Sequence, residues 1–167
     1  MLSACITYIA LSMEGSAFAN IAHMRKQYSL DEGHKNEVYL DYLGNKTFGI
    51  GHLVTREDAE FFQPIGTEVS PYRINEAFVC DIAESIAESK KLYPFWDELP
   101  VQAQEVLINM SFNIGRTKLR KFTEFNKAVA EQNWQAAAIE GRNSLWYTQV
   151  GDRAERLMER LDGMVQR

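Results

Sequence analysis

The chain has only two cysteines among its 167 residues, Cys5 and Cys80. So few thiols exclude a framework of several disulfide bonds, and the fold must be held together by a hydrophobic core. We expect both thiols to be buried and reduced. A bridge between the N-terminal segment and the middle of the chain is also compatible with the sequence.

Long apolar runs, histidine clusters and a basic face are missing as well. No stretch approaches the roughly 20 apolar residues of a membrane-spanning helix. The three histidines show no metal-ligand spacing, so we expect no bound metal. The net charge is -5, and the first 100 residues carry 8 basic and 15 acidic side chains. A nucleic-acid-binding protein would be expected to have a clustered basic face, so this class is excluded.

What the chain does have is enough apolar content for one substantial core or for two small lobes that share a helix, 46% over 167 residues. Residues 1–12 are apolar, and Ala17-Phe18-Ala19 has the small-x-small pattern of a signal-peptidase site. No Lys or Arg precedes this pattern. We therefore expect residues 1–22 to form an extra, uncleaved helical segment.

The stretch from Asp31 to Thr55 contains the residues best suited to catalysis. Asp41 follows Glu32 by nine residues, and Thr47 follows Asp41 by six. Gly33 has the position of a helix-terminating glycine, so we expect Glu32 in the last turn of a helix over residues 20–32. The negative end of the helix dipole would raise the pKa of an acid there.

After this helix the sequence pattern changes to that of a β-hairpin. Apolar residues alternate over residues 38–42, Gly44-Asn45 supplies a turn, and residues 46–52 read as the return strand. Gly49 and Gly51 weaken a strand, and we expect them to permit close approach of a ligand. A helix-end glutamate facing a hairpin aspartate suits glycoside hydrolysis, in which one carboxyl protonates the leaving oxygen and the other activates water or attacks.

Helices are expected over most of the remaining chain. Ser70 and Pro71 form a good helix start, and apolar residues at four-residue intervals extend the helix to about Leu92. Its length would be about 33 Å. Residues 101–114 form the most apolar predicted helix. Shorter helices are expected over residues 122–131, 134–142 and 152–164.

These features resemble the lysozymes of T-even bacteriophages and their relatives. The ordered matches cover the chain from about residue 24 to 160. In the first part they are Asp31-Glu32-Gly33, Tyr39, Asp41, Gly44, Thr47 and Gly49-Ile-Gly-His-Leu53. Downstream they are Ile108-Asn-Met110, Phe112, Gly115, Phe122, Trp134, Ala136-Ala137, Trp146-Tyr147, Gln149 and Arg153-Ala154.

The resemblance implies an α+β, mostly helical, two-lobed lysozyme-like fold in a single domain over residues 1–167. Residues of about 33–70 would form a small β-containing lobe, and residues of about 71–93 a long interlobe helix. Residues of about 94–167 would form the helical lobe, packed with the helix over 20–32.

The resemblance also implies the roles of the candidate catalytic residues. Glu32 matches the general acid of the family, and Asp41 matches the partner carboxylate that polarises water or stabilises the transition state. Thr47 completes this set by positioning a water molecule. Arg153 matches the arginine that pairs with the acid and orients it. Without a catalytic role, Glu32 would be an exposed acid at a helix end, Asp41 a turn residue and Arg153 a surface arginine.

Further positions match supporting and substrate-binding residues of the family. His52 would pair with Asp81 in a structural contact. Leu53 and Phe112 match positions that contact saccharide, and Asn113 replaces a glutamine at the cleft. Two other substrate positions of the family are changed in this chain, to Phe125 and Glu140.

The resemblance therefore implies a cofactor-free, monomeric muramidase that acts on the bacterial cell wall. It would hydrolyse the β-1,4 bond between N-acetylmuramic acid and N-acetylglucosamine in peptidoglycan, with inversion. We expect synthesis in the cytoplasm and release by lysis or export. A bacteriocin or effector muramidase has the same chemistry. A wall-binding relative without turnover is the alternative from another class.

Overall fold

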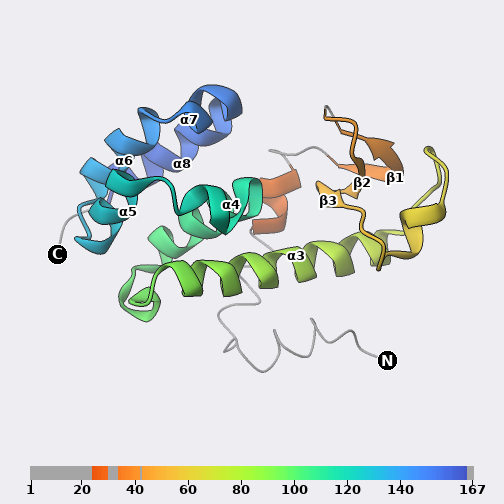
Figure 1. Ribbon diagram of the computed structural model, residues 1–167, viewed down its shortest axis with the longest axis horizontal. Helices are drawn as coiled ribbons and strands as arrows, with labels where there is room; N and C mark the ends of the chain where they lie inside the picture. Colours follow the sequence, from red (N-terminus) through yellow and green to blue (C-terminus); the bar gives the residue numbers. More distant parts are fainter. Residues whose placement is uncertain (1–23, 30–33, 42, 165–167) are drawn as a thin grey trace. The chain divides into compact units, whose positions relative to one another are not determined.

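The computed structural model describes residues 24–29, 34–41 and 43–164, and these show the predicted α+β class: a small antiparallel sheet followed by helices (Figure 1). The chain divides into two compact units, Met1–Ala83 and Glu84–Arg167. The boundary between the units falls inside helix α3 (Pro71–Leu92). The helix expected over residues 1–22, and Glu32 itself, lie outside the described residues.

The sheet of the first unit has three strands in the order β1-β2-β3. β1 (Lys35–Leu40) pairs antiparallel with β2 (Lys46–Gly49), and β2 pairs antiparallel with β3 (His52–Leu53). The single return strand predicted over residues 46–52 is therefore wrong, because the chain turns between β2 and β3. Gly49 and Gly51 make this turn with φ angles of 63° and 76°, a conformation that favours glycine.

Gly49 also allows the sheet to approach helix α3. A Cβ atom at this position would lie 2.8 Å from Cγ2 of Ile74, too close for the backbone to stay in place. The close neighbour of this glycine is a core side chain, and the approach of a ligand to Gly49 and Gly51 stays a prediction. Phe48 and Ile74 are both buried beside it, and they join the sheet to the helix in one core.

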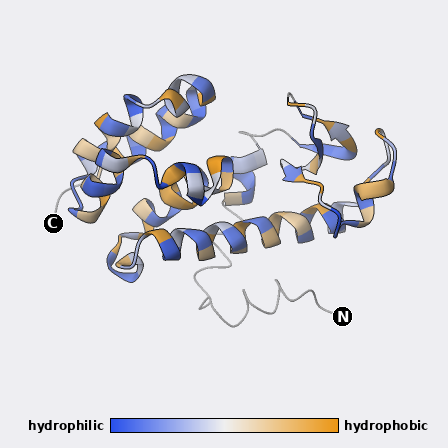
Figure 2. Ribbon diagram, in the orientation of Figure 1, coloured by the Kyte–Doolittle hydropathy of each residue, from blue (hydrophilic) through white to orange (hydrophobic). Residues whose placement is uncertain are grey.

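Helix α3 has the start that the sequence predicts. Ser70 caps it, because the backbone N–H of Arg73 donates to Ser70 Oγ at 3.2 Å, and Pro71 is its first residue. Hydrophobic and hydrophilic residues alternate along it (Figure 2). Residues 24–29 are helical, and within the first unit the Tyr28 ring packs edge-on against Phe78 with centroids 5.6 Å apart.

The second unit contains the C-terminal helices. Their bounds are η2 (Trp96–Glu98), α4 (Val101–Leu119), α5 (Thr123–Ala130), α6 (Trp134–Arg142), α7 (Leu145–Val150) and α8 (Asp152–Asp162). α4 is interrupted at Gly115, whose φ of 73° is not helical, so its regular part ends where the sequence predicts. α6 packs against both α5 and α8. Trp134, at the start of α6, is 1% exposed and forms part of this core.

The structure bears on membrane-spanning helices and on the two cysteines. No described helix is long and apolar enough to cross a membrane. Cys80 is half-buried on α3, less than we expected. Its possible partner Cys5 lies outside the described residues, so pairing stays a prediction.

Candidate functional site

The turn between β1 and β2 fixes the carboxylate of Asp41. Asp41 Oδ1 accepts hydrogen bonds from the backbone N–H groups of Leu43 and Asn45, both at 2.8 Å. Asp41 Oδ2 accepts a third bond from Asn45 Nδ2 at 3.1 Å. Gly44 completes the turn with a φ of 82°. Both oxygens of the candidate catalytic carboxylate are therefore held by the turn that the sequence predicts.

These bonds stabilise the ionised form of Asp41. Loss of solvent raises the pKa of its carboxyl. The hydrogen bonds from Asn45, Leu43 and Gly44 lower this pKa by more, so the net pKa lies below the ordinary value. Asp41 is therefore ionised at neutral pH. A carboxylate with a lowered pKa is a weak base, and it is better suited to stabilise positive charge or to orient water than to abstract a proton unaided.

Thr47 lies on β2 with 4% of its surface exposed. Its hydroxyl donates to the backbone oxygen of Asn45 at 3.1 Å. The same oxygen accepts the backbone N–H of Asp41 at 2.9 Å. Asp41 and Thr47 are thus brought together through a single residue, Asn45, which the sequence analysis placed only in the turn.

His52 lies between two carboxylates. Its Nδ1 is 2.9 Å from Asp81 Oδ2, and its Nε2 is 3.3 Å from Asp58 Oδ1. Asp58 also accepts from Arg73 Nη2 at 2.6 Å and from the backbone N–H of Thr55 at 2.7 Å. The pairing of His52 with Asp81 follows the resemblance. Asp58 and Arg73, which extend it, were not found from sequence.

The pKa values in this network follow from its contacts. Burial lowers the pKa of His52. The hydrogen bonds and charges of Asp81 and Asp58 raise this pKa by more, so the net pKa lies above the ordinary value. Burial raises the pKa of Asp58, whereas bonds from Thr55 and the charge of His52 bring the net pKa below the ordinary value. Within the described ranges, no three His, Cys, Asp or Glu side chains are arranged to hold a metal ion.

Leu53 lies beside Thr47 in the sheet. The two residues are direct partners in the pairing of β2 with β3. Leu53 is 54% exposed, which is unusual for a leucine in a strand next to a core. An exposed aliphatic surface beside a candidate catalytic hydroxyl would suit contact with the apolar face of a sugar ring, and this contact stays a prediction.

In the second unit, Arg153 lies in the first turn of α8. It is 5% exposed, and its Nε donates to Asn109 Oδ1 at 2.8 Å. Asn109, on α4, is 2% exposed. A buried guanidinium held by a buried amide has a fixed direction. Asn109 belongs to the matched Ile108-Asn-Met110 motif, but its contact with Arg153 was not predicted; the signal was a polar residue within the apolar stripe of α4.

Asn113 and Phe112 lie near the end of the regular part of α4. Trp146 Nε1 donates to Asn113 Oδ1 at 2.8 Å. This bond uses the oxygen of the Asn113 amide as its acceptor. Phe112 is half-buried. Contact of either residue with saccharide stays a prediction.

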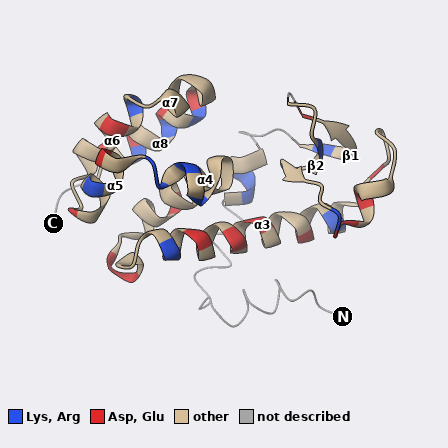
Figure 3. Ribbon diagram, in the orientation of Figure 1, with Lys and Arg blue, Asp and Glu red and all other residues tan. Residues whose placement is uncertain are grey.

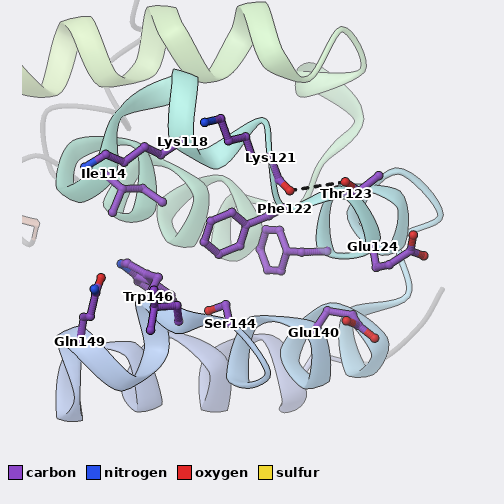
Figure 4. A pocket seen from close by; sticks show the side chains of 12 residues that line it. Ile114, Lys118, Lys121, Phe122, Thr123, Glu124, Glu140, Ser144, Trp146 and Gln149 are labelled. Atoms are coloured by element: carbon purple, nitrogen blue, oxygen red, sulfur yellow. Dashed lines mark hydrogen bonds between the residues drawn. The ribbon is translucent and has the colours of Figure 1, made fainter.

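Trp146 also lines a pocket of about 570 Å³ in the second unit. Phe122 lies at its centre, with ring centroids 6.3 Å from Phe125 and 6.4 Å from Trp146 (Figure 4). The remaining lining residues are mostly polar or charged: Ile114, Lys118, Lys121, Thr123, Glu124, Glu140, Ser144, Leu145 and Gln149. The two changed substrate positions, Phe125 and Glu140, are therefore both in one pocket.

The charges of this pocket come from different walls. Lys118 and Lys121 come from the end of α4 and the connection to α5, while Glu140 comes from α6 on the opposite side (Figure 4). Lys and Arg residues are frequent at the end of α4 and along that connection, where the ribbon is blue (Figure 3). The pocket can therefore accept a ligand that has polar or charged groups on an apolar body.

The small antiparallel sheet followed by a set of helices agrees with a lysozyme-like α+β fold. The sequence model of the phage lysozyme family matches residues 30–167, and the chain belongs to this family. The family consists of hydrolases that act on the bacterial cell wall. Membership in it assigns the chain to the peptidoglycan-cleaving glycosidases.

Individual relatives agree with this assignment. "Probable T4-type lysozyme 2" of Dictyostelium discoideum is 30% identical over 157 residues, which are 83% of this chain and 92% of the relative. "Peptidoglycan hydrolase gp36" of Pseudomonas phage phiKMV is 29% identical over 145 residues, 85% of this chain but 15% of that protein. "Pre-baseplate central spike protein Gp5" of Enterobacteria phage T4 is 30% identical over 152 residues, 80% of this chain and 26% of that protein.

Proposed function

We propose that this protein is a muramidase that hydrolyses the β-1,4 bond between N-acetylmuramic acid and N-acetylglucosamine in peptidoglycan. The observation that carries the proposal is the pair formed by Asp41 and Thr47, in which an ionised carboxylate and a buried hydroxyl are tied to one residue. The family and the name of the phiKMV relative, a peptidoglycan hydrolase, support the substrate class. We also propose that the protein acts as a monomer.

Glu32 is assigned the role of general acid by the family resemblance. In the proposed mechanism its proton passes to the glycosidic oxygen as the bond to the anomeric carbon breaks. Positive charge then develops on the sugar ring, and the Asp41 carboxylate stabilises it. Arg153 holds the acid in orientation, a role that the resemblance assigns.

Thr47 has the chemistry to hold the attacking water. Its hydroxyl hydrogen is directed to the Asn45 carbonyl, so its oxygen is left to accept a hydrogen bond from water. Asp41 is then the second acceptor for the same water. With both hydrogens engaged, a lone pair of the water oxygen is free to attack the anomeric carbon. The water becomes acidic as the new C–O bond forms, and one of its protons then passes to the Asp41 carboxylate, while the leaving oxygen takes the proton of Glu32.

This arrangement predicts inversion of anomeric configuration. Inverting glycosidases place their carboxyl groups roughly 6.5 to 9.5 Å apart to admit a water molecule, whereas retaining enzymes need about 5 to 5.5 Å. Proton NMR of the first product from a β-linked substrate should therefore show the α-anomer. The β-anomer as first product would reject inversion and would assign Asp41 the role of nucleophile.

A cell-wall assay separates this function from the alternatives. The purified protein should clear a suspension of bacterial walls and release reducing ends, and Asp41→Asn should abolish the release. A wall-binding relative without turnover would sediment with walls and release none. A bacteriocin or effector muramidase would give the same products, so the cells that release the protein, not this assay, distinguish it.

A further inference from the structure

We propose that Asn45 is a positioning residue, whose side chain and main chain hold Asp41 and Thr47 in the arrangement that hydrolysis requires. The inference rests on the proposed function of these two residues. Asn45 forms four hydrogen bonds with them. Its N–H and its Nδ2 donate to Oδ1 and Oδ2 of Asp41, at 2.8 and 3.1 Å, and its carbonyl accepts from Asp41 N–H and Thr47 Oγ1, at 2.9 and 3.1 Å.

The bonds to Asp41 fix the rotation of its carboxylate. Because one residue donates to both oxygens, the carboxylate plane cannot turn about the Cβ–Cγ bond without breaking at least one of the two contacts. The main-chain donor would be present with any residue except proline at position 45. The donor to Oδ2 belongs to the amide side chain alone, so this contact depends on the identity of the residue.

The carbonyl of Asn45 extends the same control to Thr47. A threonine hydroxyl has one hydrogen, and its direction decides whether the oxygen accepts or donates toward a ligand. Here that hydrogen points to the carbonyl. The position of this carbonyl is itself set by the Asp41 N–H bond. The turn thus presents two acceptors, a carboxylate and a hydroxyl oxygen, in a fixed relative position.

The electrostatic effect of Asn45 acts in the direction that the mechanism needs. Hydrogen bonds from its backbone and side chain lower the pKa of Asp41. Activity requires Asp41 charged while the general acid is still protonated, so these two groups define the acidic and alkaline limbs of the pH profile. By keeping Asp41 ionised at lower pH, Asn45 widens the active range on its acidic side.

The test uses two variants of Asn45 and one matched control. Asn45→Ala removes the amide donor and keeps the main-chain bonds. Asn45→Asp keeps the size of the side chain but replaces the donor with an acid beside Asp41. Asn36→Ala is the control, because Asn36 is an exposed asparagine in β1 of the same sheet, with a side-chain contact to His34.

For Asn45→Ala we expect kcat to fall roughly ten- to hundredfold at near-neutral pH, with KM little changed, because the loss is one of orientation. The acidic limb of the kcat/KM profile should move to higher pH, and further in Asn45→Asp, since a neighbouring carboxylate opposes ionisation. The carbon-13 titration of the Asp41 carboxyl should move in the same direction. Asn36→Ala should change neither.

The outcomes separate the inference from the function on which it rests. If neither the acidic limb nor the Asp41 titration moves in the two variants, Asn45 does not position Asp41 and the inference is overturned. If the titration moves while the acidic limb stays, Asp41 is not the group that activity requires, and both the inference and the proposed role of Asp41 fail. A folded wild-type protein that cleaves no cell wall would overturn the proposed function directly.

Discussion

At the residue scale, His52 and Asp58 give the protein a predictable response to pH. The pKa of His52 is raised, so its contribution to stability is fully present below about pH 6.5 and is lost as pH rises through the raised value. The pKa of Asp58 is lowered, so its contribution is present above about pH 3.9 and is lost as pH falls through the lowered value. The stabilisation should be largest between about pH 4 and 6.5.

His52→Asn should therefore lower the free energy of unfolding by about 1 to 3 kcal/mol at pH 5 to 6, and by less at pH 8. Urea unfolding at several pH values measures this difference. His34→Asn is the matched control, because His34 is exposed and its side-chain contact is to Asn36. Retained cell-wall hydrolysis in folded His52→Asn is expected. An inactive variant of unchanged stability would show that His52 belongs to the catalytic machinery.

The candidate site could be predicted from sequence only where spacing carried information. The intervals between Glu32, Asp41 and Thr47 carried the family resemblance, and the resemblance supplied their three roles, which stay predictions. The contacts of Asn45, Asp58 and Asn109 with the candidate residues were not predicted. Each of them acts through a hydrogen bond whose partner is set by a turn or by helix packing. Asparagine in a turn and aspartate before a short helix are common, so their residue types alone indicated nothing further.

At the element scale, the sequence predicted what depends on local chemistry. The ends of α3 follow from Ser70, Pro71 and the apolar spacing, and α6 has the predicted bounds. The short helix α7 was missed, although Ser144 caps it by accepting from the N–H of Tyr147 at 3.2 Å. The split between β2 and β3 was missed too, because two glycines in one apolar run do not reveal their φ angles.

The connection between α4 and α5 should help to attract the substrate. Peptidoglycan stem peptides carry carboxylates, and exposed lysines on the rim of a pocket favour an anionic polymer at low salt. We predict that Lys118→Glu with Lys121→Glu lowers the rate on cell walls roughly tenfold at low ionic strength. The defect should shrink at high salt, because exposed charges are screened.

Lys90→Glu with Lys127→Glu provides the matched control for this prediction, because it changes the net charge by the same amount. Both lysines are exposed, and neither lines the pocket. The comparison is made by measuring wall clearing across a range of salt concentrations for both proteins. An equal loss in the control would indicate that net charge, and not the pocket, governs attraction to the wall.

At the scale of the whole molecule, the α+β class and the phage lysozyme family were both predictable, because the motifs occur in order over most of the chain. The extension before these motifs is the part that the resemblance explains least. We predict that deleting residues 1–19 leaves hydrolysis per folded molecule near the parent rate, since none of the candidate catalytic residues lies there. Melting temperature and kcat of the truncated protein test this, and loss of turnover in a fully folded truncation would refute it.

The proposed mechanism depends most on Glu32, which supplies the proton for glycosidic bond cleavage. Glu32→Gln preserves size and hydrogen bonding but removes the transferable proton. The direct measurement is the release of reducing ends from purified cell walls by the folded variant, with circular dichroism as the check on folding. We predict a loss of at least roughly a hundredfold, and a comparable loss for Asp41→Asn. A folded Glu32→Gln protein that cleaves walls at the parent rate would contradict the account.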